Sequence, residues 1–436
     1  MQAGLSTQNA PSPTVVVPHF VFGAVSFLIA TVMMLLVAPD LIYYYHLNAR
    51  MLSLTHILVL GFVTMVIFGA LYQLIPVVME VKLFSEKLAK TTFYLFGPGI
   101  VILVISFWNA TFDNTQNWYW FWLSGALLLL SVMIFVFNTL MSASKTERRD
   151  MGNRFVIAAI LYLLLTVSMA ILLIVNLAVP FIPVSVLGLL KMHLSLGLVG
   201  WFLMLVIGVS SKLMPMFLII HKLPEHLLDY SFYVLNAGLL LLVSALYFYP
   251  EPWLLMSFSA VIFVGVIIYL RYIRYAFKHR FRKNLDVGMK ITAMAFILFA
   301  IILILGILVV LDPDFLSAYH IRISIAFGAS FLLGFLTAII LGQTYKTLPF
   351  IIWLQRYQSK VGKIKVPLPH ELYSAKLAKI HGQTYFPAFL LLITGILFAW
   401  VVVIQIAAVL FFITALLYNI NVFKIVFHKQ KIQDNE

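Results

Sequence analysis

Apolar residues run through this chain in long continuous stretches, separated by short segments of charged residues, Pro and Asn. Many stretches reach twenty residues, the length at which a helix crosses roughly 30 Å of hydrocarbon. They lack the alternation of barrel strands, so we expect helices. Breaking the stretches at charges, Pro and Asn/Asp clusters predicts twelve spans, with approximate limits 18–39, 50–76, 90–110, 118–141, 155–179, 184–220, 229–249, 253–274, 289–311, 317–345, 380–401 and 403–425.

Composition agrees with an all-α polytopic membrane protein in contact with the lipid bilayer. Of the 436 residues, 63% are hydrophobic and 10% are charged, whereas a soluble domain has about a quarter charged residues. The net charge of +14 does not indicate nucleic acid, because the basic residues lie between the spans. The absence of cysteine excludes disulfides, thiolate metal sites, iron–sulfur clusters and covalently attached haem.

The positions of Lys and Arg predict the orientation. In a twelve-span arrangement all but three of the 29 basic residues fall on one side of the membrane. The positive-inside rule then makes both termini cytoplasmic. We expect an N-terminal tail (1–17), a single membrane domain (18–427) and a C-terminal tail (428–436).

A short motif recurs with a period of four spans. Spans two, six and ten contain "GALYQLIP" (69–76), "GVSSKLMP" (208–215) and "GQTYKTLP" (342–349), each a G-x6-P pattern. Small residues let helices approach closely, and Pro can end a helix where it leaves the membrane. The pattern predicts three pseudo-threefold arcs of four helices, and the repeat divides the domain at about 18–80, 90–220, 229–349 and 380–427.

The same three spans each carry one histidine in the half opposite the motif. His56, His193 and His320 precede the Pro of their motif by 20, 22 and 29 residues. One histidine in a membrane helix can simply bond to a neighbouring helix, but polar residues at membrane depth usually face a functional interior. Three in corresponding spans favour a shared ligand over coincidence. We expect His19 and His381, near helix ends, to reach water by snorkelling.

The three basic residues that break the orientation pattern lie beside these histidines. Arg50 precedes His56, Lys191 precedes His193 and Arg322 follows His320. Haem would use both groups, with imidazole on its iron and Arg or Lys on its propionates. Cations near helix ends can also snorkel to the interface, which explains Arg50 more simply than the other two.

At these residues the chain resembles subunit I of the haem-copper oxidase superfamily, in particular its outlying cbb3-type, nitric oxide reductase and NnrS-type members. "THILVLGFVTMVIFGALYQLIP" resembles the second helix of that family and "MHLSLGLVGWFLMLVIG" the sixth. The resemblance implies haem b, one or two per chain. His56 and His320 would be axial ligands of a low-spin haem, and His193 would correspond to a ligand of the family's copper.

Departures from the family pattern make copper an unexpected cofactor. Span seven has no histidine pair, "YHIRISIAFG" offers His320 and then Arg322 in place of a second histidine, and Gly197 stands where helix six has a tyrosine. His193 is then a remnant of a copper site. A six-coordinate haem between His56 and His320 suits electron transfer, whereas a haem held by His193 or His320 alone leaves a position open for a gas.

Three functions therefore stay open. The first is a b-type haem protein that transfers electrons or binds nitric oxide or oxygen in a bacterial plasma membrane, with a redox partner or second subunit on the outer face. The second is a divergent oxidoreductase, a nitric oxide or oxygen reductase whose missing ligands come from another subunit. The third is a secondary transporter without haem, in which Lys191 and Arg322 bind an anionic substrate.

Overall fold

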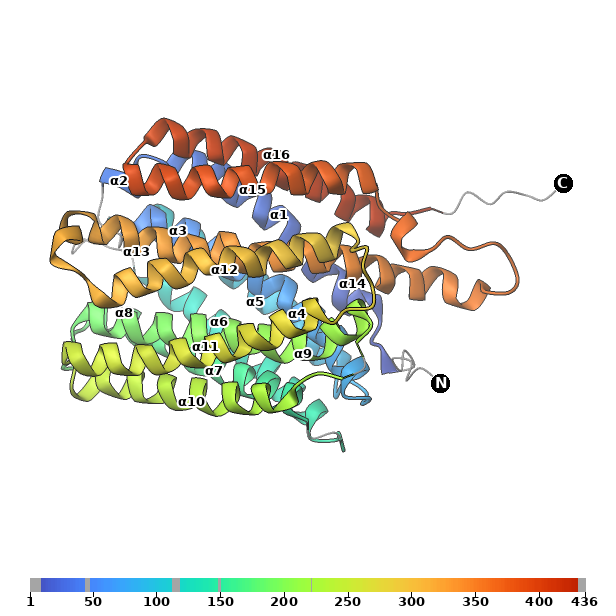
Figure 1. Cartoon of the computed structure of the whole chain (residues 1–436), viewed down its shortest axis with the longest axis horizontal. Coiled ribbons are helices and arrows are strands. Elements are labelled where there is room, and N and C mark those ends of the chain that lie inside the picture. The colour runs from blue at the N-terminus through green and yellow to red at the C-terminus, as the bar shows by residue number, and fades with distance from the viewer. Residues whose placement is uncertain (1–8, 44–47, 112–117, 148–149, 221, 430–436) are drawn as a thin grey trace.

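The computed structural model describes residues 9–43, 48–111, 118–147, 150–220 and 222–429, so parts of both predicted tails, 1–8 and 430–436, lie outside it. The described residues contain helices and turns but no β-strand. Twelve helices among them are long and apolar enough to cross a membrane. This confirms the prediction of an all-α integral membrane protein with twelve spans, which lie side by side in one bundle (Figure 1).

Nine spans are single helices and three are composite. The single helices are α1 (Pro13–Val37), α5 (Glu86–Trp108), α6 (Tyr119–Ala143), α7 (Met151–Ala178), α10 (Glu225–Phe248), α11 (Pro252–Lys278), α12 (Val287–Leu311), α15 (Ala375–Phe398) and α16 (Val401–Val426). Span two consists of α3 (Ala49–His56), η2 (Ile57–Thr64) and α4 (Met65–Val78). Span six consists of α8 (Val186–Ser195), η3 (Leu196–Leu203) and α9 (Met204–Leu218). Span ten consists of α13 (His320–Ala329), η5 (Ser330–Leu336) and α14 (Thr337–Tyr357).

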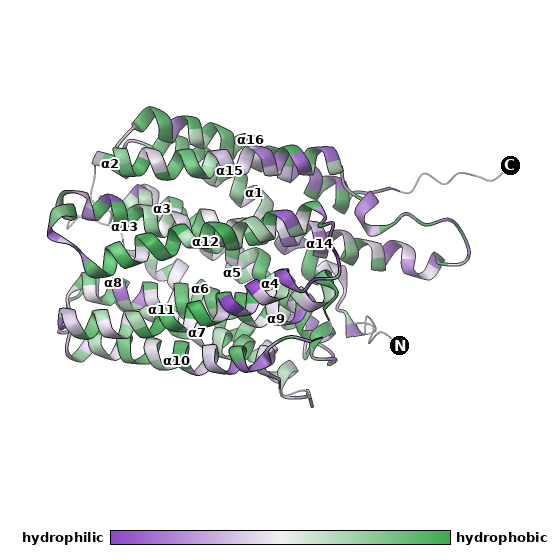
Figure 2. Cartoon of the chain, viewed as in Figure 1, coloured by the Kyte–Doolittle hydropathy of each residue, from purple (hydrophilic) through white to green (hydrophobic). Residues whose placement is uncertain are grey.

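The two ends of the bundle differ in polarity. Short helices α2 (Asp40–Tyr43) and η4 (Asp314–Tyr319) lie at one end, called the outer end below. The start of α1, the end of α16 and the segment that joins α14 to α15 lie at the other, called the inner end (Figure 1). Hydrophilic residues gather at the inner end, while the lengths of the helices are mostly hydrophobic (Figure 2).

Several helices begin four or five residues before the predicted limits. The predicted starts at 90, 155 and 380 mark where the apolar stretches begin, but the helices begin at Glu86, Met151 and Ala375. A polar side chain caps each of these ends: Ser85, Asp150 and Ser374 accept a backbone N–H from the first turn. Such caps let the polar first turn remain helical beyond the apolar region.

The helices pack in a repeated order. Spans one and two, five and six, and nine and ten pack closely as neighbours, and α5–α6, α10–α11 and α15–α16 form helical hairpins. In addition, α1 packs along α16, and η2 touches η5, so spans two and ten meet inside the bundle.

Spans two, six and ten each change from α- to π-helix in the middle. The three π-helical segments, η2, η3 and η5, each have glycine at their fifth residue: Gly61, Gly200 and Gly334. The repeated unit is therefore longer than G-x6-P: the sixteen-residue segments GFVTMVIFGALYQLIP, GWFLMLVIGVSSKLMP and GFLTAIILGQTYKTLP begin at these glycines. The buried Phe62, Trp201 and Phe335 follow them.

The second glycine of each segment allows close contact with the preceding span. A Cβ atom added at Gly69, Gly208 or Gly342 would lie 3.1, 2.9 or 2.6 Å from the carbonyl oxygen of Val16, Gly152 or Gly288. A backbone oxygen at that distance cannot easily move aside, so the motif glycines have the packing role expected of small residues between membrane helices.

The motif prolines do not end their helices. Pro76, Pro215 and Pro349 are all inside helices, and α14 continues for eight residues beyond Pro349, to Tyr357. The helix end that Pro can cause at a membrane surface is therefore not found at any of the three motif prolines. Proline in a membrane helix can be accommodated by its neighbours without a break.

Candidate functional site

The ring orientation of His56 and His193 is fixed by backbone carbonyls. His56, the last residue of α3, donates from Nδ1 to the carbonyl oxygen of Leu52 at 2.7 Å. His193, in α8, donates from Nδ1 across the helix interface to the carbonyl oxygen of Thr166 in α7, at 3.0 Å. A carbonyl only accepts, so in both neutral rings Nδ1 carries the proton and Nε2 the lone pair.

This tautomer is the one that metal-bound histidines use. A ligating histidine typically donates its second ring N–H to a carbonyl or carboxylate and binds through the other nitrogen. No hydrogen bond reaches Nε2 of His56 or His193 from the described part of the chain. The bond from His56 to Leu52, within one helix, does not by itself indicate a metal ligand, because His279 makes the same kind of bond to Tyr275. The bond from His193 to a different helix is the more informative one.

His56 and His193 both lie in the outer half of the bundle. Each is half-buried, and they are near enough for a charge on one ring to repel a charge on the other. Phe107 of α5 stacks on the His56 ring with centroids 4.9 Å apart and an angle of 27° between the planes. Spans two and six thus place two imidazoles with free Nε2 atoms in the outer half of the bundle.

His320 lies farther out. It is the first residue of α13, its side chain is 40% exposed, and its Nδ1 lies 2.7 Å from Oδ1 of Asp312. It precedes Gly334 by fourteen residues, whereas His56 and His193 precede Gly61 and Gly200 by five and seven. Because seven residues extend about 10 Å along a helix, His320 lies about that much farther toward the outer end than His193 does. No interaction joins His320 to either of the other two histidines in the described residues.

The three outer cations differ in their surroundings. Arg50 is exposed, lies 5.6 Å from the ring centre of Trp108 and interacts with Asp40. Burial raises the pKa of the Asp40 carboxyl, and the Arg50 charge opposes this rise. Arg322 is half-buried, 5.6 Å from the ring centre of Tyr319, and Lys191 is exposed. No carboxylate in the described ranges forms an ion pair with Arg322 or Lys191.

His19 and His381 are fully buried, so the expectation that they reach water was wrong. His19 donates from Nδ1 to the Val15 carbonyl at 2.8 Å and packs edge-on against Phe93 at 5.0 Å. Neither ring nitrogen of His381 has a hydrogen-bond partner among the described residues. Its ring lies among three tyrosines, Tyr345, Tyr385 and Tyr418, with centroids 5.7 to 6.5 Å away.

The π-helical segments are the part of the site that sequence reasoning missed. π-Helical turns inside α-helices are frequent at functional sites. Here η2 begins immediately after His56, and η3 begins three residues after His193. Their sequence signal was the glycine followed by an aromatic residue at 61, 200 and 334, eight residues before each motif glycine. Within the described residues, no group of three or more His, Cys, Asp or Glu side chains could hold a metal ion.

Comparison with known proteins gives one relative of similar extent. The chain is 28% identical over 311 residues to an uncharacterized protein of Aquifex aeolicus (strain VF5), a match that covers 70% of this chain and 72% of the relative. No family model matches the chain. The site must therefore be interpreted from its own geometry.

Proposed function

We propose that this chain is a membrane b-type haem protein resembling subunit I of the haem-copper oxidases, and that His56 and His193 hold the iron. The observation that carries the proposal is the pair of Nε2 lone pairs on spans two and six, each in a ring oriented by a carbonyl on Nδ1. Their position in the same half of the bundle, near enough for charged rings to repel each other, is compatible with a common ligand. This assignment replaces His320 with His193 as the partner of His56, because His320 is more exposed and bound to Asp312.

The residues present fit a haem better than they fit a bare metal ion. Two imidazoles suffice for the axial positions of a haem iron, whereas a protein-only metal site takes at least three ligands. With both histidines on the iron the haem would supply one-electron transfer, whereas a haem held by one of them alone would bind a small gas such as nitric oxide or oxygen. The half-buried Arg322 and the exposed Lys191 are the cations available to its propionates.

We further infer that the three sixteen-residue segments reflect three four-helix units arranged with threefold pseudosymmetry. The support is that spans two, six and ten each repeat the π segment, the close-packing glycine and the contact with the preceding span. The lysine-rich inner end would face the cytoplasm of a bacterial cell, with both termini there and the histidines near the opposite face.

The test is a dithionite-reduced minus oxidised spectrum of the purified protein, with a pyridine haemochrome assay. We expect a b-type α-band that is lost in His56→Ala. His193→Ala should convert the haem to a high-spin form that binds carbon monoxide, and His320→Ala should leave the spectrum unchanged. Conversion by His320→Ala instead would make His320 the second ligand. A protein that stays colourless after expression with ample haem would overturn the cofactor proposal.

A colourless protein would favour the second candidate, a secondary transporter of an anionic substrate. The observation behind it is the change from α- to π-helix in the middle of three buried spans, because departures from regular α-helix at mid-membrane are typical of transporter binding sites. Uptake of a labelled anion into proteoliposomes, reduced by Lys191→Ala and Arg322→Ala, would be its signature.

A further inference from the structure

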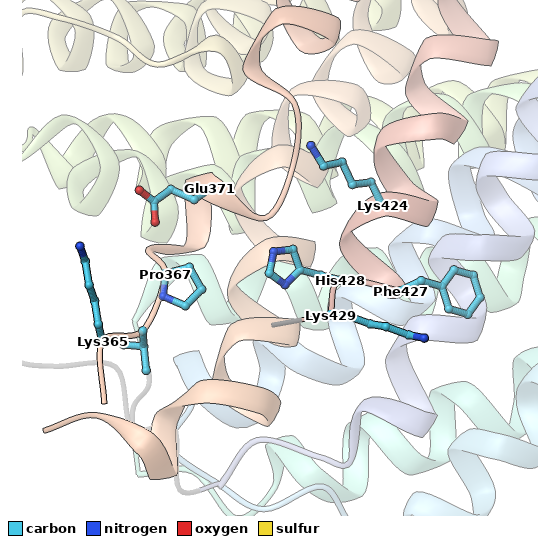
Figure 3. Close-up of a pocket in the computed structure, with 8 residues that line it drawn as sticks. Lys365, Pro367, Glu371, Lys424, Phe427, His428 and Lys429 are labelled. Carbon is cyan, nitrogen blue, oxygen red and sulfur yellow. The ribbon is translucent and has the colours of Figure 1, made fainter. Parts of the chain in front are cut away.

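A basic pocket opens at the inner end of the bundle, far from His56 and His193 at the outer end. Its volume is about 620 Å³, and eight residues line it: Lys365, Val366, Pro367, Glu371, Lys424, Phe427, His428 and Lys429. One wall belongs to the segment between α14 and α15, and the other to the end of α16 and the residues that follow (Figure 3). A cavity of this size suits a small organic ligand.

The charged side chains that line the pocket favour a negatively charged ligand. Three lysines against one glutamate leave a net charge of +2. Glu371 is already engaged, because its Oε2 accepts the backbone N–H of Leu368 at 2.7 Å. None of the three lysines forms an ion pair with a carboxylate in the described part of the chain. Their ammonium groups are therefore available to a ligand.

His428 adds a neutral donor to the pocket. Burial, with the charges of Arg356 and Lys424, lowers the pKa of His428, so the ring is neutral at pH 7. The Tyr357 hydroxyl lies 2.7 Å from its Nδ1. If the hydroxyl donates to Nδ1, the ring proton is on Nε2, where it can donate to an anion. Figure 3 shows the ring between the two walls.

Both walls are held in place from behind. The Arg356 guanidinium donates to the carbonyl oxygens of Val426 and His428, which fixes the chain just beyond α16. On the other side, Nε1 of Trp353 donates to the Pro367 carbonyl at 2.6 Å. Both anchoring side chains come from α14, so one rigid helix sets the width of the pocket.

We propose that this pocket binds a phosphate-bearing anion. Lysine ammonium groups are common phosphate ligands, and basic pockets at the ends of membrane helices suit phospholipid headgroups. The exposed Phe427 ring, 65% accessible, gives the ligand's apolar part a surface beside the charges. The same chemistry fits a soluble organic phosphate or an anionic lipid headgroup. The site is independent of any haem.

The experiment uses full-length protein in nanodiscs of neutral phosphatidylcholine. One arm titrates inorganic pyrophosphate by calorimetry, and the other measures the thermal shift when phosphatidylglycerol is added to the disc. Lys365→Ala and Lys424→Ala should weaken the response at least about fivefold, since each removes a charged hydrogen-bond donor. Lys363→Ala is the matched control, because Lys363 is an exposed lysine of the same segment outside the pocket.

The two arms separate the sources of phosphate. Pyrophosphate binding that the pocket variants weaken would support a soluble ligand, and a thermal shift that only these variants lose would support a lipid. Lys424→Gln, which keeps a polar side chain of similar length, repeats the test should Lys424→Ala unfold in neutral discs. The proposal is overturned if neither probe responds, or if Lys363→Ala reduces the response as much as the pocket variants.

Discussion

The Lys346 ammonium, in the inner part of span ten, lies 2.5 Å from a carboxylate oxygen of Asp286, the residue that caps α12. Lys212 forms the same pair with Asp150, the cap of α7. Each lysine lies four residues after its motif glycine, Gly342 or Gly208. The corresponding residue after Gly69 is Gln73, and α1 is capped by the uncharged Ser12. Two of the three units thus each contain an ion pair between a lysine after the motif glycine and the aspartate that caps the preceding span.

The ion pair between Lys346 and Asp286 should make the stability of the folded protein depend on pH. Burial by itself would raise the pKa of the Asp286 carboxyl, but hydrogen bonds from Lys346 and the Met289 N–H, with the charges of Lys346 and Arg282, lower it below its ordinary 3.8 on balance. A lowered pKa in the folded state stabilises the protein above pH 3.8, and this contribution is lost as the pH falls through the folded value. Asp286→Asn, which retains a capping side chain, should therefore destabilise the protein at pH 7 by about 1 kcal/mol.

Thermal unfolding of detergent-solubilised protein, followed by tryptophan fluorescence from pH 7 to pH 3, checks this prediction. The gap in melting temperature between wild type and Asp286→Asn should narrow as the pH decreases. A gap that stays constant over this range would show that the carboxylate charge is not the cause. Asp150→Asn removes the carboxylate of the Lys212 ion pair and provides the corresponding variant in span five.

A larger side chain at Gly342 should clash at the contact between spans nine and ten. Its added Cβ would meet the Gly288 carbonyl oxygen at 2.6 Å and Oγ1 of Thr292 at 2.7 Å. Gly342→Ala should lower the free energy of unfolding by about 1–3 kcal/mol, the usual cost of overpacking. Gly328→Ala in the same span is the control, because nothing lies within 4 Å of its added Cβ. Equal melting temperatures for the two variants would contradict the close contact.

The unpaired ring nitrogens of His381 lead us to expect that an apolar side chain at this position stabilises the protein. Both ring nitrogens are buried without partners in the described residues, and an unsatisfied buried polar group costs about 1–3 kcal/mol. His381→Phe places a flat apolar ring, somewhat larger than imidazole, among the tyrosines and should raise the melting temperature. His19→Phe loses the bond to the Val15 carbonyl and should not. A lower melting temperature for His381→Phe would mean that its ring makes essential bonds to water or a ligand.

The sequence predicted the number, order and approximate limits of the spans because long apolar stretches have few alternatives in a membrane. It did not predict where helices begin, since capped polar first turns such as the one after Ser85 look like loop. It also failed for His381, because distance from a helix end says little about burial between neighbouring helices. His193 is held by Thr166, 27 residues away, a contact that spacing within one helix cannot predict.

The absence of native cysteine makes the proposed orientation testable. Lys363 is exposed at the inner end, and Phe315, 81% accessible, lies at the outer end. In right-side-out vesicles, a membrane-impermeant maleimide should label Phe315→Cys but not Lys363→Cys. Inverted vesicles should give the opposite result. Labelling of Lys363→Cys in right-side-out vesicles would reverse the orientation inferred from the lysines.

The free Nε2 atoms of His56 and His193 predict a pattern of chemical modification. Diethyl pyrocarbonate acylates accessible, unprotonated imidazole nitrogens, and mass spectrometry of peptides locates the adducts. The exposed His279 and the partly exposed His320 should react with or without haem, and the buried His19 and His381 should not react. His56 and His193 should react more slowly when haem is supplied, because the iron would occupy the nitrogen that the reagent needs. Protection of His56 and His320 with no change at His193 would instead identify His320 as the second ligand.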